Sequence, residues 1–328
     1  MPETMSIAPT ILVTRRLPAP IEEALRTRHH ATLSTDDEPL GAERLRAALV
    51  DFDVVLCTLG DRFTRDMLAA PRRRTRLLAN FGAGVNHIDL EAARDHGIAV
   101  SNTPGVLTDD TADLTMLLLL AAMRRATEGG RELAAGSWTG WRPTHLLGAR
   151  VTGATLGIVG FGRIGQAVAR RAHLGFGMRI LYHSRREGPA AVTESLGARR
   201  AGSLHELLAA SDVVSLHCPA TAETRHLVDA AALAVMRSTS FLVNTARGDV
   251  VDEPALIDAL RRGALAGAGL DVFEGEPAVS PELLALANVF ALPHLGSATR
   301  ESRLAMGERA VANIEAFVAG LPLPDRVV

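Results

Sequence analysis

The stretch "TLGIVGFGRIGQAVARRA", residues 155–172, constrains the fold more than any other part of the sequence. Gly160, Gly162 and Gly165 come directly after an apolar strand and open a helix whose apolar residues recur at every fourth position. In such a unit the first glycine permits a tight turn, the second lets the backbone approach a pyrophosphate, and the third lets the helix pack on its strand. The pattern therefore predicts a dinucleotide-binding turn, with a purely structural glycine-rich turn as the alternative.

Short apolar runs alternate with helical stretches rich in Ala, Leu and Arg along both halves of the chain. This alternation is typical of parallel sheets whose two faces are covered by helices. It predicts an α/β fold with two Rossmann-like domains. The strand candidates are "TILVT", "DVVLC", "RLLANF" and "GIAVSN" in the first half, and "ATLGIVG", "MRILYH", "DVVSLHC", "TSFLVNTA", "AGAGLDVF" and "NVFALP" in the second.

The expected domain arrangement is discontinuous. "NTPG" interrupts the chain at Thr103 to Gly105, which we interpret as a hinge, and "VLTDDTADLTMLLLLAAMRRATEGGRELAAG" then starts a long helix. The last segment, "RLAMGERAVANIEAFVAG", is a helix that could return to the first domain. We therefore expect a discontinuous substrate-binding domain at residues 1–104 plus 296–328, with an NADP-binding and dimerisation domain inserted at 105–295.

Composition argues against several classes of function. The 328 residues include 35 basic and 37 acidic side chains, so a general nucleic-acid-binding protein is not expected. Cys57 and Cys218 are far apart and form no CxxC motif, which argues against a disulfide framework or a metal site and favours the reducing cytoplasm. "MPETMSIAPTILV" has no signal-peptide pattern, and the longest apolar run, "LTMLLLLAAM", is too short to cross a membrane.

All 35 basic side chains are arginines, and the chain contains no lysine. P-loop enzymes need a lysine on the phosphates, pyridoxal-phosphate enzymes need a Schiff-base lysine, and Tyr-x-x-x-Lys dehydrogenases need one for catalysis. These three chemistries are therefore excluded.

The strand candidate "MRILYH" ends where NAD-binding sites usually place an Asp or Glu against the ribose 2′-hydroxyl. Here no acid occurs before Glu187, and His183 is followed by Ser184, Arg185 and Arg186. A hydroxyl and two guanidinium groups suit a doubly charged 2′-phosphate. We therefore predict NADP(H) as the cofactor, with NAD(H) used at lower efficiency. A solvated basic loop is the alternative.

Three loops of the second half each follow an apolar strand, and they carry Arg247 in "NTARGDVVDEPAL", Glu276 in "GAGLDVFEGEP" and His294 in "LPHLGSAT". Because parallel sheets bind ligands at the carboxyl ends of their strands, we expect these side chains to converge. His294 would supply a proton, Glu276 would orient the ring and raise its basicity, and Arg247 would hold a carboxylate through paired hydrogen bonds. For His294 taken alone, the alternative is an ordinary core imidazole.

Four motifs follow one another along nearly the whole chain: "GFGRIG", "NTARGDVVDE", "GLDVFEGEP" and "LPHLGSAT". In these motifs, and in the separation of 29 residues from Arg247 to Glu276, the chain resembles the D-isomer-specific 2-hydroxyacid dehydrogenases. "WTGWRP" and "TPGVLTDDTADLT" point to the glyoxylate/hydroxypyruvate reductase branch, and "YHSRR" agrees with that branch's use of NADPH. The resemblance implies Arg247, Glu276 and His294 as the catalytic residues.

The resemblance also implies a substrate site. The backbone amides of Ala83 and Gly84, in "FGAGVNHID", would bind the substrate carboxylate beside Arg247, whereas an ordinary strand-to-helix turn is the alternative. Leu59, in "CTLGDRFT", would face the pocket. The family often has a polar residue at the position of Gly60, so this loop departs from the family pattern.

Trp141 lies in an arm that, in similar reductases, crosses to the other subunit and lines its substrate pocket. A core or interface anchor is the alternative for Trp141 and the preferred interpretation for Trp138. Asp271 would accept a hydrogen bond from the nicotinamide carboxamide, with a capping or surface aspartate as the alternative. Besides the glycines and the basic loop, the remaining cofactor-binding residues implied by the resemblance are Thr111, Arg163, Ile164, Cys218, Thr245 and Gly296.

These inferences together predict a homodimeric reductase that transfers hydride from NADPH to a small 2-oxoacid, taking glyoxylate or hydroxypyruvate to glycolate or D-glycerate, without a metal. One alternative is an NAD-dependent dehydrogenase of another D-2-hydroxyacid such as D-3-phosphoglycerate, although the 34 residues after His294 leave no room for the regulatory domain that many of those enzymes carry. Formate dehydrogenase relatives pair the histidine with Gln rather than Glu. A dinucleotide-sensing corepressor-like scaffold is the alternative outside the enzymes.

Overall fold

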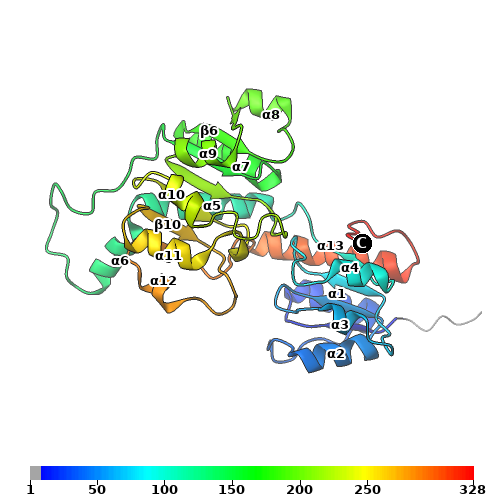
Figure 1. Cartoon of the computed structure of the whole chain (residues 1–328). Coiled ribbons are helices and arrows are strands. Elements are labelled where there is room, and N and C mark those ends of the chain that lie inside the picture. Colours follow the sequence, from blue (N-terminus) through cyan, green and yellow to red (C-terminus); the bar gives the residue numbers. More distant parts are fainter. Residues whose placement is uncertain (1–8) are drawn as a thin grey trace, which may run out of the picture. The chain divides into compact units, whose positions relative to one another are not determined.

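In a computed structural model, which describes residues 9–328, the chain folds into two compact units (Figure 1). The first unit comprises residues 9–107 and Ser297–Val328, and the second comprises Thr108–Gly296. The junctions lie slightly beyond the boundaries expected after residues 104 and 295. Residues 1–8, where no signal peptide is expected, lie outside the described residues.

The first unit is built on a four-stranded parallel sheet in the order β1-β2-β3-β4. Each of its strands lies within one of the four apolar runs predicted in the first half. All side chains of the two central strands are buried because helices cover both faces of the sheet. Its elements are β1 (Ile11–Val13), α1 (Ala19–His29), α2 (Ala42–Asp51), β2 (Val54–Cys57), α3 (Arg65–Leu68), β3 (Leu77–Asn80), α4 (Leu90–Asp95), β4 (Ala99–Ser101) and α13 (Arg300–Val318).

The last helix, α13, belongs to the first unit although it follows the whole second unit in sequence. It packs against β3 and α1, and its buried residues Met306 and Ile314 join the core on one face of the sheet. Gly307 allows the close approach to α1, since a Cβ at that position would lie 2.4 Å from Cγ1 of Ile21. The sequence-based expectation that this helix returns to the first domain agrees with the structure.

The second unit is built on a seven-stranded parallel sheet in the order β11-β10-β9-β8-β5-β6-β7. Six of its strands lie within the predicted apolar runs. The edge strand β7 was not predicted, because its two residues are arginines and show no apolar pattern. Its elements are α5 (Thr108–Met123), α6 (Ala126–Ala134), β5 (Thr155–Val159), α7 (Arg163–Phe176), β6 (Arg179–His183), α8 (Ala190–Ser195), β7 (Arg199–Arg200), α9 (Leu204–Ala210), β8 (Val213–Leu216), α10 (Ala230–Val235), β9 (Phe241–Asn244), the 3₁₀ helix η1 (Gly248–Val250), α11 (Glu253–Arg261), β10 (Gly267–Leu270), α12 (Pro281–Ala285) and β11 (Val289–Ala291).

Strand order in the second unit determines where a ligand can bind. β5 pairs with β6 on one side and with β8 on the other, and all three strands are parallel. After β5 the chain adds strands toward one edge of the sheet and then crosses back to add β8 on the opposite side of β5, so the strand order reverses at β5. Open parallel sheets bind ligands outside the carboxyl ends of their strands at such a point. The loops with the predicted cofactor and catalytic residues follow β5, β6, β8, β9, β10 and β11, and therefore all lie at this carboxyl edge.

The long helix expected after "NTPG" is two helices in the structure. α5 ends at Met123 and α6 begins at Ala126, with Arg125 between them in the left-handed region at φ 56°. The amide of Ala149 donates to the Met123 carbonyl at 2.8 Å, so a returning segment satisfies this group instead of a next helical turn. The segment between α6 and β5 extends away from the sheet of its unit (Figure 1) and carries Trp138 and Trp141.

Across residues 9–328, no helix has both the length and the apolar character needed to cross a membrane.

Candidate active site

His294 and Glu276 form the central pair of the site. Nδ1 of His294 lies 2.7 Å from Oε2 of Glu276, and the other carboxylate oxygen accepts the amide of Phe273 at 2.8 Å. A carboxylate can only accept, so Nδ1 carries the proton and Nε2 faces away without a partner in the described chain. Burial acts to raise the pKa of Glu276, but the hydrogen bond and charge of His294, the Phe273 amide and the Arg247 guanidinium lower it below its ordinary value.

Asp271 holds the turn that carries His294 by accepting hydrogen bonds from its backbone. His294 has a left-handed backbone with φ 55°, and its amide donates to the Asp271 carbonyl at 2.9 Å. The next two amides, of Leu295 and Gly296, donate to the two carboxylate oxygens of Asp271 at 2.7 and 2.8 Å. Burial raises the pKa of Asp271 to about 6, against the lowering effect of the Leu295 amide. Asp271 therefore supports a turn conformation that a histidine rarely adopts.

Arg247 stands on a tight turn directly after β9. The Asn244 carboxamide holds this turn, because its Nδ2 donates to the Arg247 carbonyl at 2.9 Å and its oxygen accepts the Ala246 amide at 2.9 Å. The following residue must be glycine, since a Cβ on Gly248 would lie 1.9 Å from the backbone of Phe273. The loops that carry Arg247 and Glu276 thus pack backbone against backbone.

The Arg247 guanidinium is half-buried and remains outside every ion pair of residues 9–328. It donates to the Ala246 carbonyl at 2.6 Å. Burial lowers the pKa of Arg247, while the charge of Glu276 opposes this shift. A half-buried guanidinium that forms no close ion pair has donors left for an anion, so this side chain is suited to a carboxylate ligand.

Helix α5 connects the loops of Arg247 and His294 through three threonines. Thr111 donates to the Gly296 carbonyl at 2.9 Å, and Thr115 donates to the Thr111 carbonyl at 2.7 Å. The single proton of Thr115 is used in that bond, so Thr245 must donate to the Thr115 hydroxyl across 2.9 Å. All three side chains are buried. Thr111 and Thr245 thus connect α5 to the loops that carry His294 and Arg247.

The glycine-rich turn after β5 fits a dinucleotide. Gly160 has φ 94°, and a Cβ there would lie 2.6 Å from the Cys218 amide nitrogen; a Cβ on Gly165 would lie 2.3 Å from the Gly160 carbonyl oxygen. A Cβ on Gly162 would meet nothing within 4 Å, and no side chain caps the helix α7 that follows it. Open backbone at a helix start is suited to a pyrophosphate. Of the other predicted residues, Arg163 is exposed on the first turn, Ile164 is half-buried against the core and Cys218 is half-buried after β8.

The loop after β6 presents exposed positive charge. Arg185 and Arg186 are exposed, and within the described residues neither lies within 4 Å of a carboxylate, although the charge of Arg185 also interacts with that of Glu223. Ser184 donates to the Arg186 carbonyl and its own carbonyl accepts from Arg200 at 2.9 Å. Nδ1 of His183 is buried and lacks a hydrogen-bond partner in this part of the structure. The loop therefore offers donors and charge to an anionic group.

A ring stack fixes this basic loop on the sheet. The rings of Phe161 and Tyr182 stack with centroids 4.2 Å apart, and the Tyr182 hydroxyl accepts the Gly188 amide at 3.2 Å. Gly188 lies so close to Phe161 that a Cβ would be 2.7 Å from its ring. The glycine-rich turn and the basic loop are thus packed on the same aromatic pair.

The predicted substrate residues Leu59, Ala83 and Gly84 belong to the first unit. Leu59 is 37% exposed and covers the turn of Ala83, since a Cβ on Gly82 would lie 3.0 Å from its Cδ2. The carboxylate of buried Asp61 holds the Leu59 loop by accepting the Thr58 amide at 2.8 Å. A Cβ at Gly60 would meet nothing within 4 Å, so the fold of this loop leaves room for a side chain at that position.

The segment after α6 carries exposed apolar side chains. Trp141 is 83% exposed, Trp138 52% and Leu147 66%, so neither tryptophan is a core residue of this chain. Exposed tryptophans in an extended segment are typical of an interface with another molecule.

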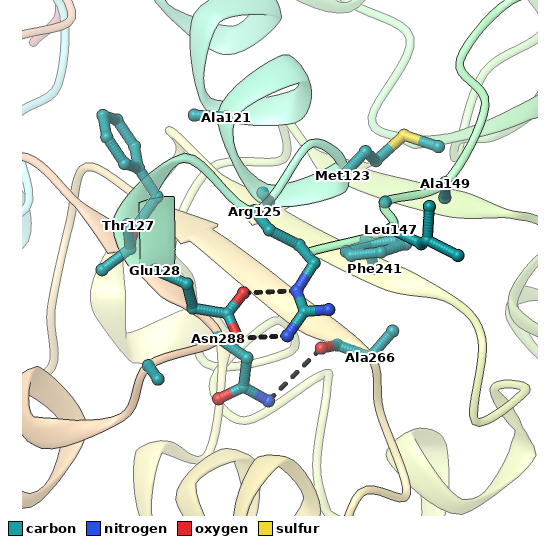
Figure 2. Close-up of a pocket in the computed structure, with 14 residues that line it drawn as sticks. Ala121, Met123, Arg125, Thr127, Glu128, Leu147, Ala149, Phe241, Ala266 and Asn288 are labelled. Atoms are coloured by element: carbon teal, nitrogen blue, oxygen red, sulfur yellow. Dashed lines mark hydrogen bonds and ion pairs between the residues drawn. The ribbon is translucent and has the colours of Figure 1, made fainter. Parts of the chain in front are cut away.

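A cavity of about 440 Å³ lies at the amino ends of β9, β10 and β11, the sheet edge opposite to the catalytic loops (Figure 2). In Figure 2 the side chains of Arg125 and Glu128 face each other, joined by contacts of 2.7 and 2.6 Å. Because this cation is already neutralised, the cavity offers no free charge to a ligand. No group of three His, Cys, Asp or Glu side chains within residues 9–328 could hold a metal ion.

Sequence reasoning missed several supporting residues, among them Asn244, Gly248 and Thr115. Asn244 ends a strand directly before the Arg247 loop, a position where a short amide often binds its own backbone, and this signal was present. Gly248 and Thr115 act through contacts with residues distant in sequence, so no local pattern identified them.

Comparison with known proteins finds relatives that match nearly the whole chain. A family model described as D-isomer specific 2-hydroxyacid dehydrogenase, NAD binding domain, matches residues 116–296. The glyoxylate reductases of Thermococcus onnurineus and Thermococcus kodakarensis are 44% and 45% identical over 324 residues, each covering 97% of this chain and 96% of the relative. A solved structure of the NADPH-dependent glyoxylate/hydroxypyruvate reductase from Sinorhizobium meliloti, in complex with NADP and malonate, matches with a TM-score of 0.85 at 34% identity, covering 98% of this chain and 97% of that one.

Proposed function

Because the chain belongs to the D-isomer specific 2-hydroxyacid dehydrogenase family, we propose that it is an NADPH-dependent reductase of small 2-oxoacids. The proposed reactions take glyoxylate to glycolate and hydroxypyruvate to D-glycerate. The observation that carries the proposal is the His294–Glu276 pair at 2.7 Å, on the same sheet edge as Arg247 and the glycine-rich turn. The names of the similar enzymes support glyoxylate as the substrate.

The chemistry divides between cofactor and protein. Bound NADPH would supply a hydride to the carbonyl carbon of the 2-oxoacid. His294, with Nδ1 held by Glu276, presents Nε2 as the proton donor to the carbonyl oxygen. Arg247 polarises the carbonyl and pairs with the substrate carboxylate, so the negative charge that develops on oxygen meets a preorganised cation.

We assign the substrate carboxylate also to the backbone amides of Ala83 and Gly84, beside the side chain of Leu59. In residues 9–328 neither amide donates to an acceptor, and both residues are half-buried. The family resemblance supports this assignment. Closure of the two domains about Thr103 to Gly105 would expel water before hydride transfer.

For the cofactor we assign NADPH over NADH. The exposed Arg185 and Arg186, with Ser184 and His183, support binding of a 2′-phosphate where an NAD site would have an acid. Asp271, buried beneath the His294 turn, retains one lone pair on each oxygen for the nicotinamide carboxamide.

We further propose that the active form is a homodimer in which Trp141 completes the neighbour's pocket, with the exposure of Trp141 and Leu147 as support. We expect the protein in the cytoplasm, where cysteines stay reduced, since Cys57 and Cys218 are both free.

Steady-state kinetics over a panel of 2-oxoacids with NADPH and NADH test the function directly. The expected result is the highest kcat/KM with glyoxylate or hydroxypyruvate and NADPH. A higher kcat/KM for 3-phosphohydroxypyruvate with NADH would replace the proposal with a phosphoglycerate dehydrogenase, and absence of turnover with cofactor binding retained would favour a dinucleotide-sensing scaffold.

A further inference from the structure

Two asparagine side chains bind three consecutive backbone carbonyl groups of the first unit, so these carbonyls all point toward the two carboxamides. Nδ2 of Asn80 donates to the carbonyls of Gly82 and Gly84, both at 2.9 Å. Nδ2 of Asn102 donates to the intervening carbonyl of Ala83 at 2.7 Å. The two carboxamides come from the ends of neighbouring strands, β3 and β4, and converge on one turn.

This arrangement dictates where the amides of the turn point. A trans peptide group directs its N–H opposite to its carbonyl, so three carbonyls turned inward leave three N–H groups turned outward. They belong to Ala83, Gly84 and Val85, and none of them donates a hydrogen bond to any residue from 9 to 328. Successive backbone amides in a turn that are free of other acceptors are suited to bind an anion.

Asn80 keeps this geometry at a cost to its own hydrogen bonding. It is 1% exposed, and its Oδ1 is buried without a partner in the described chain. The reverse amide orientation would place that oxygen against two carbonyl oxygens, so only the observed one is compatible with the turn. A buried, unpaired carbonyl destabilises a fold, so a native protein that retains one calls for an explanation, and a functional role is one such explanation.

We propose that Asn80 and Asn102 are positioning residues for substrate binding: by holding the carbonyls of Gly82, Ala83 and Gly84, they aim the adjacent amides at the carboxylate of a 2-oxoacid. This inference rests on the proposed function and adds the residues that build its carboxylate site. Neither asparagine touches the substrate, and each acts through the backbone of the turn.

The test compares Asn80→Ala and Asn102→Ala with the wild type in NADPH-dependent reduction of glyoxylate. Loss of one or more aimed amides should raise KM for glyoxylate about 10-fold or more, because hydrogen bonds to a charged group are lost. The inhibition constant of oxalate should rise in parallel, whereas KM for NADPH should stay within about twofold, since its predicted residues all lie in the other unit. Asn102 is only half-buried, so its variant is the one expected to keep the fold most fully.

Asn313→Ala is the matched control. Asn313 is also a fully buried asparagine of the first unit, and its Nδ2 donates to the Arg309 carbonyl at 2.8 Å and to Asp325 at 3.0 Å. Its loss should lower the Tm without raising KM for glyoxylate. Unchanged KM and oxalate inhibition in folded Asn80 and Asn102 variants, or an equal rise in the Asn313 variant, would overturn the inference. A wild-type protein that reduces no 2-oxoacid would instead overturn the proposed function.

Discussion

Nδ1 of His294 and Oε2 of Glu276 lie 2.7 Å apart, although the two residues come from different loops and are separated by 18 positions in the chain. Their side chains are 30% and 32% exposed, so the pair is reachable by a small substrate while being largely shielded from water. This relationship leaves one ring nitrogen committed to the carboxylate and the other available for proton transfer.

His294→Ala and Arg247→Ala should therefore impair catalysis differently. Loss of the proton donor should lower kcat by roughly 100-fold or more with KM little changed, whereas loss of the guanidinium should lower kcat and raise KM together. Steady-state kinetics with glyoxylate separate the two outcomes. A near-wild-type kcat in the histidine variant would exclude the assigned mechanism.

Glu276→Gln should shift the pH profile of reduction. Because the pKa of Glu276 is lowered, its charge persists at neutral pH and favours the protonated ring that reduction needs. Without that charge, the pH at which kcat/KM for glyoxylate falls to half should move down, because a neighbouring negative charge favours the protonated form of a titrating group. The lowered pKa of Glu276 also affects stability. At a pH above the pKa that a glutamate has in the unfolded chain, the ionised carboxylate stabilises the fold, and this contribution is lost as the pH falls through the lower pKa of the folded protein. Exposed Glu282→Gln is the control, and equal midpoints in all three proteins would contradict the assignment.

Thr115→Val should weaken the support that α5 gives to the two catalytic loops. The substitution keeps the shape of the side chain but leaves the Thr245 hydroxyl without its acceptor, which should lower the free energy of unfolding by about 1–3 kcal/mol. It should also lower kcat, since Thr115 no longer links the loop of Arg247 to the loop of His294 through its hydrogen bonds. Thr115→Ser retains the hydroxyl and should behave like the wild type. Denaturant unfolding and kinetics check both effects, and equal behaviour of Val and Ser would show that the hydroxyl has no such role.

Arg185→Ala should selectively raise KM for NADPH. One lost charge-assisted hydrogen bond corresponds to roughly 10- to 150-fold in affinity, while use of NADH should hardly change. The salt sensitivity of NADPH binding should weaken as well. Arg262→Ala removes an exposed arginine of the same unit, on α11's carboxyl end, and is the control. If the wild type prefers NADH, or the Arg185 variant loses both cofactors equally, the loop is an ordinary basic surface turn.

The protein should sediment as a homodimer at assay concentrations, and Trp141→Ala should raise KM for the 2-oxoacid. Leu174→Ala removes another strongly exposed apolar side chain, 71% exposed on α7, and should change neither property. A stable and fully active monomer would refute the dimer and the role of Trp141 together.

Local patterns in the sequence were enough to identify every strand except β7, the glycine-rich turn and the loops that carry Arg247, Glu276 and His294. Gly160 and Gly165 are required by the geometry of a short strand-turn-helix unit, and Gly162 completes a local pattern that is recognisable in the sequence. A run of apolar residues likewise predicts a strand that is buried on both faces. The positions of Arg247, Glu276 and His294 after parallel strands likewise predicted a common edge, because all strand ends of such a sheet point the same way.

Only the tertiary structure decided how those residues are held. The Asp271 carboxylate beneath the His294 turn, the threonines of α5 and the inward carbonyls bound by Asn80 and Asn102 are contacts between side chains and distant or neighbouring backbone. The break between α5 and α6 depends on Ala149 reaching the Met123 carbonyl from a later segment. Periodicity and turn chemistry act over a few residues, whereas a hydrogen bond across the fold forms only after packing has placed donor and acceptor within about 3 Å. For this reason the sequence alone determined which residues gather at the sheet edge, and the folded chain determined their orientation.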